Sequence, residues 1–220
     1  MRDRWNRLTD PSRDADEGFT LVELLISMII FGMAMAMVTT AVTKVQSYAG
    51  DAQGSADANS ELRLALADID KQVRSGNVLY SPANETSPSS CTASGSDAGT
   101  CMRVFTQANG LERCVQWQVV ADPANPTKTV LRSRSWSTTW QTDHKYTDWV
   151  VKARNLVPGQ QRPFALEGAA TASSSRYLQV RFEAIDARRA APAVITSALA
   201  GRNTNYGYDA GLCSPAPPTS

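Results

Sequence analysis

One apolar run near the start of the chain constrains its structure more than any other feature. From Phe19 to Val38 the chain has 20 residues without Lys, Arg, Asp or Pro. A helix of this length rises about 30 Å, which is the thickness of the hydrocarbon core of a bilayer. Glu23 is the one acid in the run, and a carboxylate inside a membrane helix costs on the order of 3 kcal/mol on insertion scales. We therefore expect a cation on a neighbouring copy of the chain to neutralise Glu23.

The same segment resembles the type IV pilin and pseudopilin superfamily. Prepilins of that superfamily share a Gly, then Phe-Thr-Leu-x-Glu, then a long apolar helix, and here the corresponding run is Gly18-Phe19-Thr20-Leu21-Val22-Glu23. The resemblance implies that a prepilin peptidase cleaves between Gly18 and Phe19 on the cytoplasmic side and methylates the new amino group of Phe19. It also implies three further partners, namely the membrane before assembly, an inner-membrane assembly platform, and other pilin or pseudopilin subunits.

The charges in this segment favour the same interpretation. Cleavage after Gly18 leaves a cationic amine at Phe19, and Glu23 follows it by about one helical turn. In a filament, Glu23 of one subunit would neutralise the Phe19 amine of the next, and removal of one partner from such a buried pair costs about 3 to 5 kcal/mol. The alternative is that Glu23 lies near the lipid headgroups and extends its carboxylate into water.

Two other interpretations of the apolar run compete with this one. An ordinary membrane anchor would need neither the Gly-Phe junction nor the glutamate. A signal peptide would use the A-x-A-like site at Ala34-Met35-Ala36. The run before that site is long for an apolar region of 7 to 15 residues, and it contains an acid. The mature N-terminus, Phe19 or Met37, distinguishes the signal peptide from the prepilin.

The basic residues around the run predict its orientation. Only Lys44 follows the run closely, whereas four arginines precede it: Arg2, Arg4, Arg7 and Arg13. Because short segments rich in Lys and Arg stay in the cytoplasm, residues 1–18 should lie in the cytoplasm. The resemblance implies that they are a leader peptide that is removed. The chain should then cross the inner membrane once. By the resemblance, it ends in a filament on the cell surface or in the periplasm.

The helix should continue beyond the membrane, from about Phe19 to Ser75. We expect a transmembrane and filament-core part over residues 19–40 and an amphipathic part over residues 41–76. Gly50 lowers helix stability by about 1 kcal/mol relative to alanine and is a possible bend. Four residues recur on one face with a period of 3.6: Leu62, Leu66, Ile69 and Val73.

Residues 77–220 should form one exported β-rich domain. Residues 81–100 are rich in Pro, Ser, Thr and Gly and are typical of a loop. Alternating or β-branched runs then predict strands at residues 102–107, 111–121, 129–136, 177–184 and 193–199, with a hairpin turn at residues 108–110. The predicted fold is α+β, with a long N-terminal helix packed on a C-terminal antiparallel sheet. The net charge of +1 does not indicate nucleic acid or acidic substrates.

Four cysteines, Cys91, Cys101, Cys114 and Cys213, lie on the exported side of the predicted span. An even number of cysteines in an oxidising compartment suggests two disulfides, with three possible connectivities. We favour Cys91 with Cys101 and Cys114 with Cys213. Zinc is the alternative, but the chain has no C-x-x-C pair and a single histidine, His144. We therefore expect no metal.

No motif for catalysis or for a cofactor is present in the sequence. His144 has no nucleophile motif beside it, and there is no P-loop, G-x-S-x-G or G-x-G-x-x-G. We expect His144 on a surface loop, no cofactor, and no enzymatic activity.

An aromatic and basic cluster supports a second functional hypothesis. A platform for single-stranded nucleic acid or carbohydrate would combine stacked aromatic rings with cations. Such residues gather in the middle of the chain: Trp117, Trp136, Trp140, Trp149, Tyr146, Arg132, Arg134 and Lys145. They suit either packing or a filament-carried adhesin or DNA-uptake receptor, and the receptor requires Trp136, Trp140 or Trp149 to be exposed beside Arg132 or Lys145. The leading hypothesis remains a structural subunit similar to a minor pilin or a J-type pseudopilin.

Overall fold

The computed structural model describes residues 19–167, 177–185, 192–201, 208–209 and 211–218. The predicted leader, residues 1–18, and with it Gly18 of the processing junction, lies outside the described residues. The chain divides into two compact units, residues 1–50 and residues 51–220. From here on, the name β-rich domain refers to the whole second unit, which includes the end of the long helix as well as residues 77–220.

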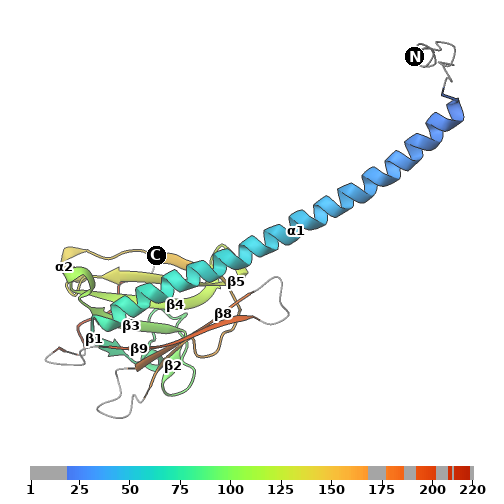
Figure 1. Ribbon diagram of the computed structural model, residues 1–220. Helices are drawn as coiled ribbons and strands as arrows, with labels where there is room; N and C mark the ends of the chain where they lie inside the picture. Colours follow the sequence, from blue (N-terminus) through green and yellow to red (C-terminus); the bar gives the residue numbers. More distant parts are fainter. Residues whose placement is uncertain (1–18, 168–176, 186–191, 202–207, 210, 219–220) are drawn as a thin grey trace, which may run out of the picture. The chain divides into compact units, whose positions relative to one another are not determined.

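Helix α1 extends from Leu21 to Arg74, which agrees with the predicted helix from about Phe19 to Ser75 (Figure 1). Gly50 lies inside the helix without interrupting it. The helix ends where the amide of Ser75 donates to the carbonyl oxygen of Lys71 at 3.2 Å. The next residue is Gly76, where a Cβ would lie 2.8 Å from Cγ2 of Val104. The close approach to the sheet therefore requires glycine at this exit from the helix.

A nine-stranded antiparallel sheet forms most of the β-rich domain. The order of the strands is β1-β3-β4-β5-β6-β8-β7-β2, and β9 pairs with β8 outside this path. The longest pairings join β4 to β5 and β8 to β9. The strands are β1 Gly76–Tyr80, β2 Ala98–Gly99, β3 Cys101–Thr106, β4 Arg113–Asp122, β5 Asn125–Trp136, β6 Val150–Leu156, β7 Phe164–Leu166, β8 Tyr177–Ala184 and β9 Ala193–Ala200. The short helices are η1 Pro82–Asn84, η2 Ala108–Gly110 and α2 Trp140–Asp143.

The five predicted strands are confirmed as β3, β4, β5, β8 and β9, although β5 begins earlier than expected, at Asn125. Four strands were not predicted: β1, β2, β6 and β7. The prediction of a plain loop over residues 81–100 is wrong in part, because this stretch contains η1 and β2. At the predicted hairpin turn, Asn109 and Gly110 have φ values of 63° and 73°, in the left-handed region that Asn and Gly tolerate.

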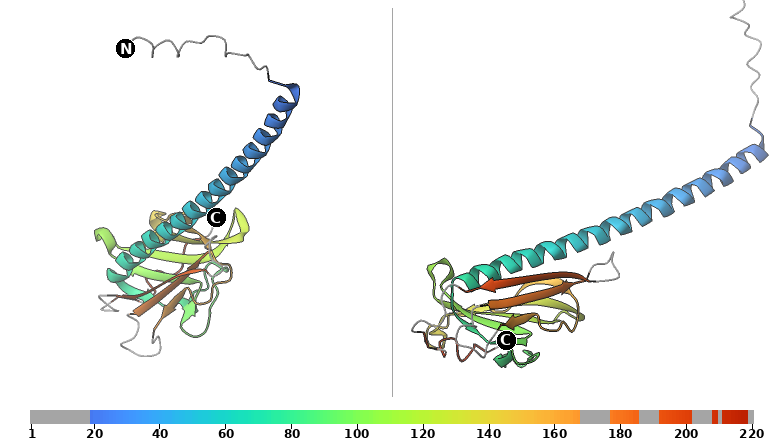
Figure 2. Two further views of the ribbon diagram at one scale, coloured as in Figure 1. Left: turned by 45° about the vertical axis from the view of Figure 1, so that its right-hand side comes forward. Right: turned by 60° about the horizontal axis from the view of Figure 1, so that its bottom comes forward.

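The predicted stripe of α1 packs on one face of the sheet (Figure 2). Leu62, Ile69 and Val73 are fully buried there, and Leu66 is partly buried. Their partners are apolar residues of the central strands, including Met102, Val104, Val115, Val119 and Leu131. The buried indole of Trp117 also donates to Oε1 of Gln72 at 2.7 Å, which ties β4 to the helix. The amphipathic stripe therefore supplies one side of the main core.

The opposite face of the sheet, called the far face below, is covered by two segments of the chain rather than by α1. Residues 82–92 lie over part of it, and residues 211–218, called the C-terminal strap, lie over another part. A second apolar cluster forms beneath the strap from Val78, Phe105, Cys114, Trp136 and Cys213. Central strand β4 is consequently buried on both faces from Cys114 to Val119.

Candidate functional site

Two regions carry functional groups: the N-terminal apolar part of α1 and the far face of the sheet. At the start of α1, Thr20 caps the helix. The amide of Glu23 donates to Oγ1 of Thr20 at 3.3 Å, and the amide of Leu24 donates to the Thr20 carbonyl oxygen at 3.1 Å. Thr-x-x-Glu is the sequence pattern of a capping box, which satisfies free amides at a helix start. This role of Thr20 was not predicted, although a Thr-x-x-Glu pattern before an apolar run indicates a helix start.

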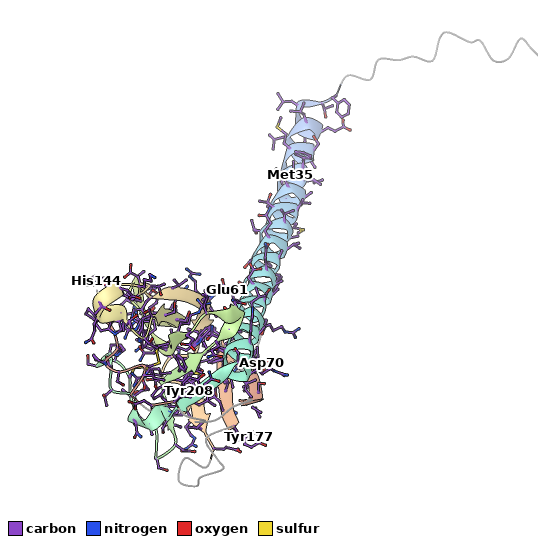
Figure 3. All side chains as sticks on the ribbon, turned by 90° about the vertical axis from the view of Figure 1, so that its left-hand side faces the viewer. Met35, Glu61, Asp70, His144, Tyr177 and Tyr208 are labelled. Atoms are coloured by element: carbon purple, nitrogen blue, oxygen red, sulfur yellow. A yellow bond between two sulfur atoms is a disulfide. The ribbon has the colours of Figure 1, made fainter. Side chains whose placement is uncertain are left out.

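Within the described part of the chain, the apolar part of α1 is not buried. The segment Leu21–Gln53 is long and apolar enough to span a membrane, and its most apolar window is 0% buried. Its large side chains stand out on all sides around Met35 (Figure 3). Full burial of a Leu, Ile, Phe or Met side chain contributes about 1.5 to 3 kcal/mol. This surface therefore requires a bilayer or other apolar helices around it.

Four hydroxyl groups in this segment donate to carbonyl oxygen atoms of the helix itself. Ser27 donates to the Leu24 carbonyl oxygen at 2.9 Å, and Thr39 donates to that of Met35 at 2.8 Å. Thr40 and Thr43 make equivalent bonds to Ala36 and Thr40. Buried polar groups without partners are unfavourable in an apolar medium, and these bonds remove that penalty.

The carboxylate of Glu23 differs from these hydroxyl groups, because the described part of the helix does not bind it. Within the described chain, no hydrogen bond or ion pair reaches the side chain of Glu23, and the side chain is exposed. Phe19, whose amino group is the predicted partner on another copy, is 76% exposed. The start of α1 therefore offers an unneutralised carboxylate about one helical turn from the exposed side chain of Phe19, on an otherwise apolar surface.

A buried polar layer occupies the far face. Glu85 is 3% exposed and forms an ion pair with Arg103, with 2.7 Å between Oε1 and Nη2. The fully buried amide of Gln116 donates to Oε2 of Glu85 at 2.9 Å and accepts from Nε of Arg134 at 2.9 Å. Arg132 binds Oε1 of Gln118 through Nε and Nη2. In the sequence, these polar residues alternate as they would on a solvent-exposed face of a strand. In the structure, residues 82–92 and the C-terminal strap cover them.

Burial changes the ionisation of this layer. It lowers the pKa of Arg134 to about 10, and the neighbouring charges of Arg132 and Arg103 act in the same direction. Burial also raises the pKa of Glu85 above its ordinary value of 4.5, although the charge and hydrogen bond of Arg103 oppose this change. The layer thus contains three arginines and one glutamate. Desolvation is the largest cause of the pKa shift at both Arg134 and Glu85.

The C-terminal strap is fixed to the far face through its carbonyl groups. Arg103 donates to the carbonyl oxygen of Cys213 at 2.7 Å, and Arg134 donates to that of Pro217 at 2.8 Å. Between them, the indole of Trp140 donates to the carbonyl oxygen of Pro215 at 2.9 Å. The arginines and the tryptophan are therefore engaged by the chain's own tail.

The structure separates the members of the predicted aromatic platform. Trp117 is fully buried in the main core and Trp136 is 2% exposed. Trp140 and Trp149 are half-buried. Trp149 does lie beside a cation, since the guanidinium carbon atoms of Arg132 and Arg134 lie 4.5 and 4.7 Å from its ring centroid. The receptor alternative requires one exposed indole. Trp136 does not meet this requirement, and Trp140 and Trp149 meet it only in part.

The outer members of the predicted platform lie on the surface. Lys145 is exposed, and Tyr146, 43% exposed, packs its ring edge-on against Trp140 with 5.9 Å between centroids. His144 is exposed at the end of α2, in the left-handed conformation with φ 53°. Its position agrees with the predicted surface loop. Among the described residues, no group of three His, Cys, Asp or Glu side chains is placed to hold a metal ion.

Both disulfides favoured in the sequence analysis are present in the structure. Cys91 is bonded to Cys101, which closes the loop before β3, and Cys114 is bonded to Cys213, which ties the strap to β4. All four cysteines are buried. The disulfides therefore hold in place the two segments that cover the far face.

Comparison with known proteins identifies the N-terminal segment. Residues 13–39 match the family model described as the prokaryotic N-terminal methylation motif. No match was found among curated proteins or among solved structures. The motif covers the Gly18-Phe19 junction and the start of α1, and it agrees with the resemblance seen in the sequence.

The motif, the apolar helix and the antiparallel sheet together define a class of protein. The chain has the features of a type IV pilin-like or pseudopilin precursor, in which an N-terminal helix is followed by a β-rich domain. Precursors of this kind are anchored in the membrane, processed by a peptidase, and assembled with other subunits.

Proposed function

We propose that this chain is a minor pilin or pseudopilin, a structural subunit of a type IV pilus or of a type II secretion-like filament. Prepilin peptidase removes residues 1–18 by cleavage after Gly18, and the subunit waits in the inner membrane with its N-terminus in the cytoplasm. The assembly platform then adds it to a filament, where Glu23 neutralises the Phe19 amine of an adjacent subunit. The carboxylate of Glu23, which has no partner within the described chain and lies on the exposed apolar part of α1, carries this proposal.

Residues 19–40 would form the membrane span and later the filament core, with residues 41–76 as the amphipathic part of the same helix. Two properties of the segment support this. Its large apolar side chains are all exposed, so they suit both lipid and neighbouring helices. Its hydroxyl groups are satisfied within the helix, so Glu23 is the one polar group there that needs another molecule.

The decisive experiment separates processing from assembly. Glu23→Ala should leave cleavage after Gly18 intact and lower incorporation into filaments at least a hundredfold, because loss of one partner from a buried ion pair costs about 3 to 5 kcal/mol. Glu23→Gln should behave in the same way, since it keeps the shape and removes the charge. Asp51→Ala is the matched control, because it removes an exposed acid from the same helix beyond the apolar run.

Immunoblots of sheared filaments and of membranes measure incorporation and cleavage separately. N-terminal sequencing of the mature chain should begin at methylated Phe19. Normal incorporation of the Glu23→Ala chain would refute the pairing with the Phe19 amine. A mature chain that begins at Met37 would instead show processing as a signal peptide.

The adhesin or DNA-uptake alternative has less support from the β-rich domain. The indoles are at least half-buried, and Trp140 is engaged by the strap. Among the described residues, Trp149 between Arg132 and Arg134 retains the required chemistry. Binding of single-stranded DNA that is lost on Trp149→Ala would revive this alternative.

A further inference from the structure

Strand β9 is a free edge of the sheet. It pairs with β8 along its whole length, from Ala193 opposite Ala184 to Ala200 opposite Tyr177. No described strand pairs with its other side. The remaining strands at the ends of the order are shorter, with five residues in β1 and two in β2. Figure 2 shows β9 running beside β8 on the side of the sheet that α1 covers.

The register shows which backbone groups of β9 are free. On β8, the amide of Arg181 donates to Pro163 and the carbonyl oxygen of Glu183 accepts from Val157, so the odd-numbered residues face β7 and β6. The even-numbered residues therefore bond to β9, because backbone groups alternate along a strand. Their partners in β9 are residues 193, 195, 197 and 199. The outward amide and carbonyl groups belong to Val194, Thr196, Ala198 and Ala200, and within the described chain no hydrogen bond engages them.

The sequence of β9 does nothing to prevent pairing. Natural edge strands are usually protected by charged residues, proline, bulges or covering segments. The run from Ala193 to Ala200 contains no charged residue and no proline, and its register on β8 has no bulge. On the free side of β6, by contrast, a backbone amide is occupied. The amide of Arg154 donates to the carboxylate of Glu61 at 2.9 Å. Glu61 of α1 therefore protects the edge at β6, whereas no described segment makes such a bond to the edge of β9.

A hollow of about 500 Å³ separates the end of β9 from the flank of α1. Ser197 to Ala200 form one wall, and the helix contributes Arg63, Leu66, Ala67, Asp70 and Arg74 to the other. Asp70, labelled in Figure 3, is paired with Arg74 at 2.8 Å. Arg63 is exposed and has no ion pair among the described residues, so the hollow carries one unneutralised positive charge.

We propose that the edge of β9 accepts an extended segment of a neighbouring filament subunit as an additional strand. The segment pairs with the outward backbone groups of residues 194–200, and it carries an acidic residue opposite Arg63. Backbone hydrogen bonds provide affinity in such strand addition, and the side-chain contacts provide specificity. The inference rests on the proposed function, because the partner is another subunit of the same filament.

Proline at an outward position tests this mechanism. Ala198→Pro removes an amide that makes no bond to β8, and proline is tolerated on edge strands at such positions. Ala198→Ser is the matched control, because it keeps the amide and a small side chain. We expect incorporation of the proline variant into filaments to fall at least about fivefold, because the variant loses one main-chain hydrogen bond to the added strand. The serine variant should assemble normally.

Thr196→Lys provides a second variant that does not disturb the backbone, since the side chain of Thr196 is exposed. It should also reduce incorporation, because an edge lysine opposes pairing. Arg63→Glu should reduce incorporation more than Arg63→Gln. Resistance of the β-rich domain to protease in membranes checks that each variant is folded, and the full-length chain is used throughout.

The outcomes separate this inference from the proposed function. Wild-type incorporation of both Ala198→Pro and Thr196→Lys would overturn strand addition while leaving the Glu23 pairing intact. An equal defect in Ala198→Ser would also overturn it, because the side chain rather than the amide would then matter. Normal assembly of Glu23→Ala tests the proposed function alone.

Discussion

Removal of the disulfide between Cys114 and Cys213 should destabilise the β-rich domain by about 5 kcal/mol. The two cysteines are 99 residues apart in sequence, and in the chain-entropy model a loop of that size accounts for about 4.7 kcal/mol. The disulfide between Cys91 and Cys101 spans 10 residues, for which the same model gives about 3 kcal/mol. The two double alanine variants should therefore differ by about 2 kcal/mol.

Burial is nearly the same for the two bonds, so loop length is the main difference between them. Cys101 and Cys114 are fully buried, Cys213 is 1% exposed and Cys91 is 8% exposed. Alanine avoids placing a new polar group in these positions. The strap also keeps contacts that do not depend on sulfur, such as the bond from Arg103 to the carbonyl oxygen of Cys213.

Urea unfolding of the full chain in detergent, followed by tryptophan fluorescence, measures the free energy of unfolding of each variant. The signal is suitable because Trp136 lies in the apolar cluster with Cys114 and Cys213. A larger loss for the Cys91 and Cys101 variant would refute the reasoning from loop length. Equal losses would indicate that the strap retains its position without the disulfide.

Three further predictions concern the β-rich domain in the same unfolding assay. Ile69→Ala should lower the free energy of unfolding by about 2 to 5 kcal/mol, because Ile69 is fully buried, whereas Leu64→Ala should change it by less than about 0.5 kcal/mol, because Leu64 is 70% exposed. Trp117→Phe should lower it by about 1 kcal/mol through loss of the hydrogen bond to α1, and a neutral result would show that this bond contributes nothing net. For Glu85, the folded pKa is raised, so its contribution is complete below pH 4.5 and is lost as the pH rises through the folded value. The stability of Glu85→Gln relative to the wild type should therefore improve from pH 4 to pH 7, and the opposite trend would mean that the ion pair with Arg103 outweighs burial.

The elements predicted correctly are those whose apolar pattern is local. Leu62, Ile69 and Val73 recur with the helical period, and β8 alternates Leu178, Val180 and Phe182 with polar residues, so both faces could be assigned before the structure was known. Strand β6 was missed because its register on β5 is irregular and its charged residues bind α1, as Lys152 does with Asp68 at 3.3 Å. The sequence of β6 therefore does not alternate between a buried apolar face and an exposed polar face.

The far face could not be predicted from the strands that form it. Arg132 and Arg134 alternate with serine in β5, a pattern typical of a solvent face. Arg134 is nevertheless 3% exposed, because the strap lies over it and accepts its hydrogen bond at Pro217. Only the distant Cys213 connected the strap to this face in the sequence. The burial of the polar layer depends on a long-range contact rather than on any local period.

The stability of the β-rich domain should be independent of the residues that are proposed to drive assembly. Within the described chain, Glu23 has no side-chain partner and the apolar part of α1 is not buried. The core instead uses the stripe from Leu62 to Val73. Glu23→Ala should therefore change the free energy of unfolding by less than about 0.5 kcal/mol, as is usual for exposed positions. A loss above 1 kcal/mol would contradict this separation, and an assembly defect in that variant would then reflect folding rather than the missing charge.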